Sequence, residues 1–206
     1  MHVSLNEVEN TALKAARGAG SPWGIAEEAG RASRWLAARG LPWLAPLTAM
    51  LEARLASPVT AHADCPILAG TRIVDVWPLR GGAAPALPKA IRAPLLLVPF
   101  LAQASESGVP VAVSWPGVVA HLIDGALQPE VADMAALAAE GPLAAAITVG
   151  AAAQIHGAAV LKPRTGGAEV EPQLFDRLRG LAARTYVPES EQSKLKGAGA
   201  GLLDND

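Results

Sequence analysis

The sequence predicts an α+β protein, with a three-helix N-terminal lobe packed on a mixed β-sheet that has flanking helices. Residues 1–57 carry helix-capping residues and apolar residues three or four positions apart, whereas the chain after Val59 consists of short apolar segments that Gly and Pro interrupt. A length of 206 residues suits one ordinary domain with its own core. We therefore expect a single structural domain made of a helical lobe over 1–57, an α+β body over 58–187 and a Gly-rich polar tail over 188–206.

The N-terminal lobe is expected to contain three helices joined by short links. The first begins after Ser4, which forms a capping box with Glu7, and ends at Gly18. The second has Ser21 as its N-cap and Pro22 in its first turn, and it ends near Arg39. The third runs from about residue 43 to 57. The apolar stripes expected to face the core are Leu5, Val8, Ala12 and Ala15 on the first helix and Ile25, Ala29, Ala32 and Leu36 on the second.

The body is expected to mix strands, loops and short helices. Alternating apolar residues predict strands over 71–79, 109–114 and 118–123, with a type II turn at Pro116–Gly117 between the last two. The run 95–105 fits a helix and a buried strand equally well. The remaining expectations are a loop over 81–88, a short helix over 130–140, a hairpin between 158–162 and 168–171, and a last helix over 172–185.

Charge and composition disfavour several classes of partner. The formal net charge is −2 and the isoelectric point about 6.1, so we expect no nucleic-acid partner and no membrane partner. A single Cys excludes an internal disulfide and a cysteine metal cage. The first ten residues lack a basic segment ahead of an apolar run, which predicts a cytoplasmic protein. The apolar run 143–160 is mostly Ala and Gly and is expected to be buried interior.

Small residues dominate the apolar part of the chain. Ala accounts for 44 of the 206 residues, and the aromatic residues are five Trp, two Phe and one Tyr. A core with so few large side chains predicts close helix packing that a second subunit completes, so we expect a homo-oligomer, most simply a homodimer.

The segment Arg17–Gly24 is the clearest candidate for a binding site. It is a Gly-rich link with an Arg before it and a helix N-terminus after it, where backbone N–H groups and the helix dipole favour phosphate or carboxylate. It lacks the ending of a P-loop. An ordinary helix–helix turn with a Gly C-cap and a Ser N-cap explains the same pattern. The residues predicted to bind an anionic substrate are Arg17, Gly18, Gly20, Ser21, Trp23, Gly24 and Arg31.

Candidates for general acid–base roles lie near both ends of the chain. Glu27 and Glu28 are adjacent, so they diverge by about 100° on a helix and cannot share a proton. A solvated face that pairs with Arg31 and Arg34 explains them better than an acid–base dyad. Tyr186 and Glu189 belong to a polar segment just ahead of the tail. If the tail folds back over Arg17–Gly24, these four residues can supply catalysis.

The other reactive side chains fit structural roles better. Cys65 lies in an expected loop without a Cys–His signature, and it is most simply a small buried apolar residue. The four His show no metal-ligand spacing, so no metal site is expected, and nothing indicates a particular cofactor. His121 and Asp124 point to opposite faces of an expected strand, with His121 on an exposed face. His156 lies in an apolar stretch and fits a core position.

Two stretches of sequence resemble a known family. They are SLNEVENTALKAARGAGSPWGIAEEAGRASRWLAARGLP over residues 4–42 and RTYVPESEQSKLKGAGAGLLDND over residues 184–206. Together they resemble a family of uncharacterised bacterial proteins that is known only as a domain of unknown function. The resemblance therefore implies no activity, cofactor or catalytic residue.

Two functions follow as hypotheses. The first is a small-molecule enzyme or enzyme subunit of bacterial metabolism, which acts on a carboxylate- or phosphate-bearing substrate held at Arg17–Gly24. The second is a non-catalytic accessory or ligand-binding module of a bacterial metabolic complex. An enzyme needs two titratable groups within hydrogen-bond reach in one pocket, whereas a binding module does not. The grouping of polar and aromatic residues at both ends of the chain slightly favours the enzyme.

Overall fold

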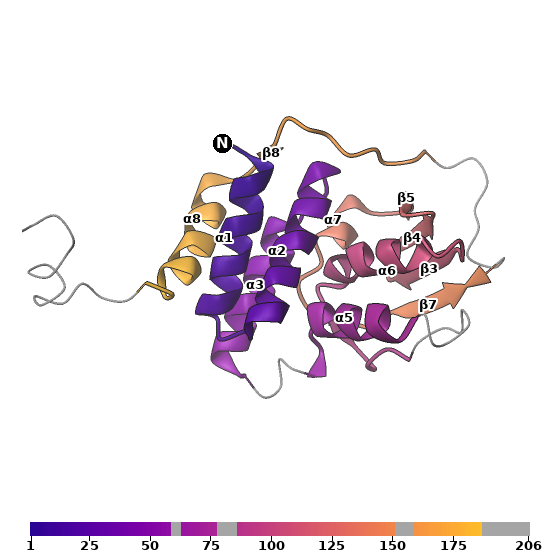
Figure 1. Cartoon of the computed structure of the whole chain (residues 1–206), viewed down its shortest axis with the longest axis horizontal. Helices are drawn as coiled ribbons and strands as arrows, with labels where there is room; N and C mark the ends of the chain where they lie inside the picture. Colours follow the sequence, from indigo (N-terminus) through magenta and orange to yellow (C-terminus); the bar gives the residue numbers. More distant parts are fainter. Residues whose placement is uncertain (59–62, 78–85, 151–158, 187–206) are drawn as a thin grey trace, which may run out of the picture.

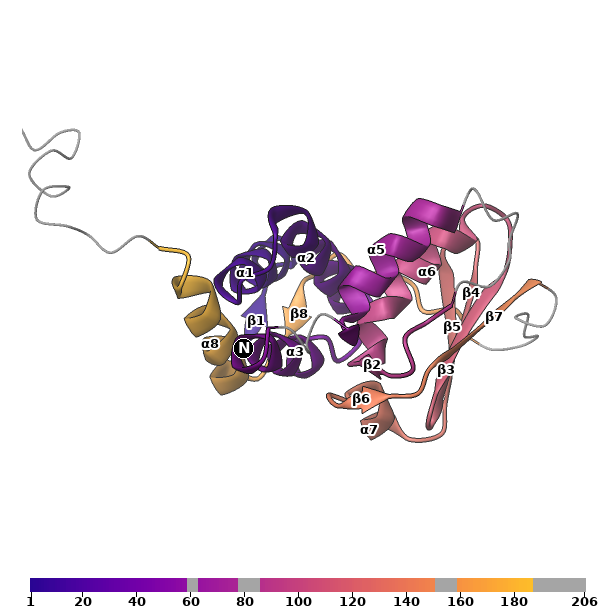
Figure 2. The ribbon, with the colours of Figure 1, turned by 90° about the horizontal axis from the view of Figure 1, so that it is seen from below.

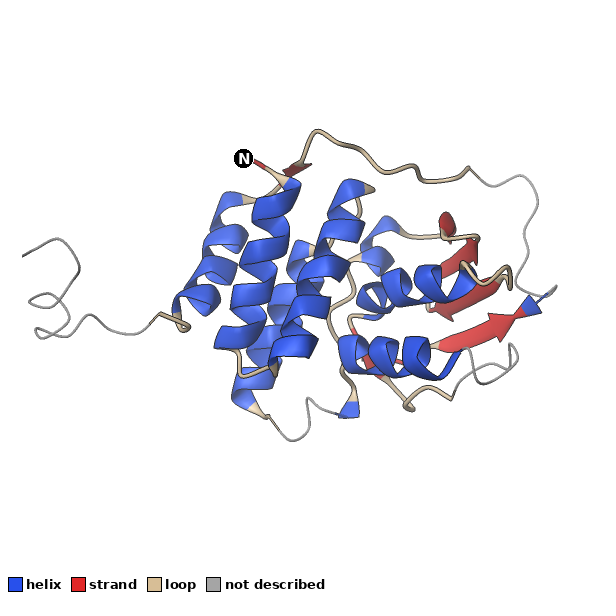
Figure 3. Ribbon diagram, in the orientation of Figure 1, coloured by secondary structure: helices blue, strands red, loops and turns tan. Residues whose placement is uncertain are grey.

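The computed structural model describes residues 1–58, 63–77, 86–150 and 159–186, and it confirms the α+β class. Helices α1, α2, α3 and α8 gather at one end of the molecule, and most of the strands lie at the other end with α5 and α6 (Figures 1 and 3). We call these the helical half, which comprises α1, α2, α3 and α8, and the sheet half, which comprises α5, α6 and the strands β3, β4, β5 and β7. Every strand pair in the described ranges is antiparallel, so the expected mixed sheet is wrong in that detail.

The helical half begins as the sequence predicts. Helix α1 covers Leu5–Gly18, and the Ser4 hydroxyl accepts the amide of Glu7 at 3.1 Å as its N-cap. Helices α2 and α3 cover Trp23–Ala38 and Leu44–Ala56. The second helix buries the expected Ala29, Ala32 and Leu36, whereas Ile25 is only partly buried.

The last helix, α8, completes the helical half. It covers Pro172–Ala183 and packs on α1 and α3, two helices that are far from it in the sequence. A Cβ atom on Gly18 would lie 1.9 Å from the carbonyl oxygen of Leu181, so only glycine permits this approach. The short strands β1, His2–Val3, and β8, Ala168–Glu169, pair and lead the chain back to this position. The expected hairpin between 158–162 and 168–171 is therefore wrong, because β8 pairs with β1 and Leu161 forms an isolated bridge to Leu127.

A four-stranded sheet with the order β5-β4-β3-β7 forms the sheet half. Helix α6 packs on β3 and β4, and α5 packs on α6 (Figure 2). The predicted hairpin is confirmed, since β3 and β4 meet at Pro116–Gly117, where Gly117 has φ +84°. The bounds are α5 Pro66–Val76, α6 Val98–Ser105, β3 Val111–Trp115, β4 Val118–Ile123, β5 Ala126–Val131 and β7 Ala146–Val149.

Three shorter elements join these layers. A 3-10 turn, η2, covers Pro94–Leu97 ahead of α6, so the ambiguous run 95–105 is helical. Strands β2, Ile91–Arg92, and β6, Pro142–Leu143, pair with each other. Helix α7 is a single turn, Met134–Leu137.

Four further expectations about the body are wrong, each for a physical reason. Of the strand expected over 71–79, residues 71–76 belong instead to α5, and residues 78 and 79 lie outside the described residues. The buried Ile67, Gly70 and Ile73 of α5 recur every three residues behind a helix-starting Pro66. The helix expected over 130–140 shrinks to α7 because residues 130 and 131 pair in β5.

The apolar run 143–160 is the third case. Its described part, residues 143–150, contains the edge strand β7 and is exposed or half-buried, whereas we expected buried interior. His121 is the fourth: it is only 8% exposed because its strand β4 lies between β3 and β5. Within the described ranges, no helix has both the length and the apolar character that crossing a membrane requires.

Candidate functional site

The link between α1 and α2 closes on itself through backbone hydrogen bonds. The amides of Ala19, Gly20 and Ser21 each donate to a carbonyl of the last turn of α1 at 2.9 Å. Gly20 has φ +84°, which favours glycine at this position. Three of the amides that the sequence offered to an anion are therefore used to end α1.

Ser21 does not cap α2, so that expectation is wrong. The N-cap residue is Pro22, which provides no side-chain cap. Ser21 is buried, and its amide donates to the carbonyl of Ala16. The first-turn amides of α2 follow immediately, at Trp23, Gly24 and Ile25. Helical geometry gives these amides no intrahelical acceptor, and they carry the positive end of the helix dipole.

Three guanidinium groups from three different helices converge on this link. Arg17, from the end of α1, donates from Nη1 to the carbonyl of Ser21. Arg54, in the last turn of α3, donates from Nη2 to the carbonyl of Gly20 at 3.2 Å. Arg184, the C-cap residue of α8, donates from Nε to the carbonyl of Gly18 at 3.1 Å. We call Arg17, Arg54, Arg184 and residues 18–24 together the arginine loop.

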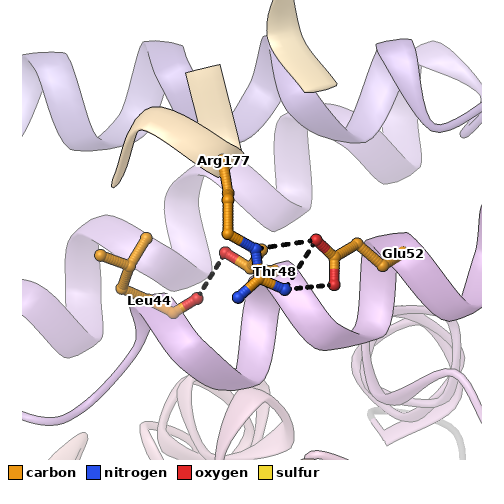
Figure 4. A network of polar contacts seen from close by, with 4 residues as sticks. All are labelled: Leu44, Thr48, Glu52 and Arg177. Carbon is orange, nitrogen blue, oxygen red and sulfur yellow. Dashed lines mark hydrogen bonds and ion pairs between the residues drawn. The ribbon is translucent and has the colours of Figure 1, made fainter. Parts of the chain in front are cut away.

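The arginine loop has no acidic counterpart in the described part of the chain. Other arginines of the helical half do pair with carboxylates, namely Arg31, Arg34, Arg177 and Arg179. Figure 4 shows one example, in which Arg177 Nη2 lies 2.7 and 2.9 Å from the two carboxylate oxygens of Glu52 while Thr48 donates to the carbonyl of Leu44. The hydrogen bonds of the three loop arginines go to backbone carbonyls, so no carboxylate of the described residues neutralises their positive charge.

An exposed aromatic ring lies at the same place. The Trp23 side chain is 63% exposed, and the guanidinium carbon of Arg17 lies 4.6 Å from its ring centroid. The contact fixes Arg17 on one side, in addition to its bond to the Ser21 carbonyl. The loop thus combines positioned positive charge with an accessible apolar surface.

The remaining predicted site residues lie elsewhere. Arg31 contacts both Glu28 and Glu27, with 3.8 Å between its Nη2 and a carboxylate oxygen of Glu27. Glu28 and Arg31 line a cavity of about 290 Å³ between α2 and α6. This geometry is the salt-bridged helix face that the sequence left open as an alternative.

Tyr186 lines a different depression. Its ring is exposed, lies 5.8 Å from Lys14 Nζ, and contributes with Arg179 to a groove of about 350 Å³ between α1 and α8. The described structure therefore does not bring Tyr186 to Glu27 or Glu28. Glu189 and the tail that was expected to fold back lie outside the described residues.

Sequence reasoning missed Arg54 and Arg184 as members of the site. Each lies at the C-terminal end of a helix that the sequence did predict, where basic side chains favour exposed carbonyl groups. That position is the only local signal, because their approach to residues 18–24 depends on how α3 and α8 pack.

The structure also gives the surroundings of the other candidate reactive groups. Cys65 is buried at the start of α5, and burial raises the pKa of its thiol, which disfavours the reactive thiolate. His121 Nε2 lies 3.6 Å from Glu130 Oε1. The described residues contain no cluster of three or more His, Cys, Asp or Glu side chains that could hold a metal ion.

Comparison with known proteins covers the N-terminal part of the chain. A family model described as "Protein of unknown function (DUF3726)" matches residues 3–80. This segment thus resembles a family of unknown function. The match includes Arg17–Gly24 and Arg54, but not the ending 184–206 that also carried the expected resemblance. No curated protein and no solved structure matches the chain.

Proposed function

We propose that the protein is a ligand-binding module that holds the phosphate or carboxylate group of a small molecule at the arginine loop. The observation that carries this proposal is the convergence of Arg17, Arg54 and Arg184 on one link without a carboxylate among the described residues. Three neighbouring positive charges repel each other, and a bound anion relieves that repulsion.

The loop has unused hydrogen-bond capacity for such an anion. A guanidinium offers five N–H donors in a planar fork, and each of the three groups donates one hydrogen bond to a loop carbonyl. The carbonyl contacts hold the guanidiniums in place before a ligand arrives. Remaining donors suit the bidentate geometry of phosphate and carboxylate, and the first-turn amides of α2 add further positive potential.

Binding without catalysis fits the geometry better than the enzyme hypothesis. General acid–base catalysis requires titratable side chains within hydrogen-bond reach of the bound substrate. Glu27 and Glu28 are instead engaged with Arg31, and Tyr186 lies in the groove between α1 and α8. No second candidate function is supported by an observation of comparable weight.

The test is calorimetric titration with inorganic pyrophosphate. We expect the wild-type protein to bind pyrophosphate, and the Arg54→Gln and Arg184→Gln variants each to bind about 5- to 10-fold more weakly, because each loses one charge-assisted contact. Arg72→Gln is the matched control, since Arg72 is an exposed arginine on α5. It should bind like the wild type. Melting curves check that every variant is folded.

A purely structural role for the three arginines gives a different result. If they only cap helix ends, the Arg54→Gln and Arg184→Gln variants melt earlier, but pyrophosphate binds neither them nor the wild type. Equal affinity in Arg54→Gln, Arg184→Gln and Arg72→Gln would also overturn the proposal.

A further inference from the structure

A cavity of about 590 Å³ lies at the other end of the helical half. Helix α2 separates the two places, because the arginine loop lies at its start and the cavity is lined by Ala37 and Gly40 at its end. A helix of 16 residues is about 24 Å long, so one ligand of ordinary size does not reach both. The cavity is therefore independent of the proposed function.

The wall of this cavity is largely apolar. It is formed by the link between α2 and α3, the first turn of α3, the β1–β8 pair, α7 and the first turn of α8. The large apolar side chains of the lining include Leu41, Trp43, Leu44, Met134 and Leu174. A volume of this size and an apolar lining are typical of small-molecule sites.

The acidic groups of the rim have partners other than Arg164. Glu169 has a carboxylate oxygen 3.7 Å from the N-terminal amine of Met1. The carboxylate of Glu171 accepts the amides of Gln173 and Leu174, and so caps α8. Neither carboxylate pairs with the guanidinium of Arg164 in the described structure.

The basic group of the rim is Arg164, for which the described residues provide no acidic partner. Its backbone amide donates to the carbonyl of Ala38 at 2.6 Å, which fixes the residue beside the end of α2. The guanidinium lies against Gly40, where a Cβ atom would be 3.5 Å from Nη1. No carboxylate among the described residues contacts this guanidinium. The cavity thus carries one positive charge at its rim and apolar side chains inside.

The start of α3 adds to the same polarity. Its N-cap residue is Trp43, which provides no capping side chain, and the amides of Leu44 and Ala45 follow in the first turn. Such amides favour a negative group. Helix α8 differs, because Glu171 already caps it.

We infer that this cavity is a binding site for an amphipathic carboxylate, a medium-chain fatty acid in its chemistry, with the carboxylate on Arg164 and the chain among the apolar side chains. Charge complementarity selects this ligand class, since the cavity pairs one uncompensated cation with an apolar interior. Met134 is 70% exposed at the mouth and offers a flexible apolar surface to the end of the chain.

The experiment is titration of the full chain with decanoate and, separately, with decanol. We expect decanoate to bind more tightly than decanol, because only decanoate carries the charge. Arg164→Gln should weaken decanoate binding about 5-fold and leave decanol binding unchanged. Arg72→Gln, the matched control, should change neither affinity.

A second pair of variants tests the apolar part. Ala45→Phe, in α3, and Ala138→Phe, at the end of α7, each place a ring into the cavity. Either variant should reduce decanoate binding at least 10-fold. Two positions are used so that one misfolded variant does not decide the outcome. Arg54→Gln should bind decanoate like the wild type, which separates this site from the arginine loop. Absence of decanoate binding, or equal effects of Arg164→Gln and Arg72→Gln, would overturn the inference.

Discussion

The two halves of the molecule build their cores in different ways. The α1–α2 contact of the helical half buries mainly small residues, namely Ala12, Ala15, Ala16, Ala26, Ala29 and Gly30. The core of the sheet half, together with the adjoining turn η2, contains large side chains, namely Leu95, Leu96, Leu97, Phe100, Leu101 and Trp115. The α1–α2 contact depends on close approach of backbones, whereas the sheet half depends on side-chain volume. Elsewhere the helical half also buries large side chains, namely Leu36, Leu47, Leu51 and Phe175. Adding atoms at the α1–α2 contact should therefore lower the stability of the protein, and so should removing atoms from the core of the sheet half.

The largest effect is expected from removing volume in the sheet half. Leu97 is fully buried in η2, so Leu97→Ala should lower the free energy of unfolding by about 2–5 kcal/mol. Urea unfolding measures the loss. Leu143→Ala is the control, because Leu143 is only partly buried and its loss should cost less. Equal losses for the two variants would contradict a core that depends on volume at Leu97.

Adding a methyl group to the helical half should give the next largest effect. A Cβ on Gly30 would lie 2.8 Å from the carbonyl oxygen of Glu9, so Gly30→Ala should destabilise by about 1–3 kcal/mol despite the higher helix propensity of Ala. Gly180→Ala is the matched control inside α8. Nothing lies within 4 Å of its Cβ position, so it should stabilise by up to about 1 kcal/mol. A neutral or stabilising Gly30→Ala would refute the close-approach account.

Burial in the sheet half also predicts a pH effect. Burial raises the pKa of the Cys65 thiol in the folded state above its unfolded value. The unfolded chain therefore loses this proton first, and the stability that the neutral thiol contributes is complete below the unfolded pKa and falls as pH rises above it. Cys65→Ala should show a smaller loss of stability between pH 8 and pH 10, as measured by urea unfolding. An unchanged pH profile would contradict the burial effect.

The smallest effect is expected at the surface of the helical half. Arg177 and Glu52 join α8 to α3 through an ion pair whose side chains are 58% and 40% exposed. Water and salt screen such a pair, so Glu52→Gln should change the melting temperature by about 1 °C or less. A shift as large as that of Gly30→Ala would mean that α8 is held by surface charge rather than by its apolar face.

The same contrast explains how much of the fold the sequence predicts. Helix α1 was predictable because Ser4 and Glu7 are close in sequence and act locally. The place of α8 was not, since it depends on Gly18 meeting Leu181 across most of the chain. In the sheet half, the Pro116–Gly117 hairpin was predictable for the same local reason, whereas the alternation over 71–79 also fits a helix face and led to a wrong assignment.

The candidate site was likewise predictable from the sequence only in part. Arg17 and the Gly-rich link were visible as a motif, whereas Arg54 and Arg184 join it only through packing of α3 and α8. The expected homodimer stays a prediction. Its basis was a core poor in large residues, and sedimentation of the 21.0 kDa chain as a species of twice that mass would support it.

The central claim is that the arginine loop binds an anion. The most direct measurement is an NMR titration of the ¹⁵N-labelled protein with pyrophosphate, which reports every amide separately. We predict that the largest shifts occur at the amides of Trp23, Gly24 and Ile25 and at the guanidinium Nη–H groups of Arg54 and Arg184, and that they saturate together. Shifts that are absent, or that centre on residues outside the arginine loop, would contradict the account.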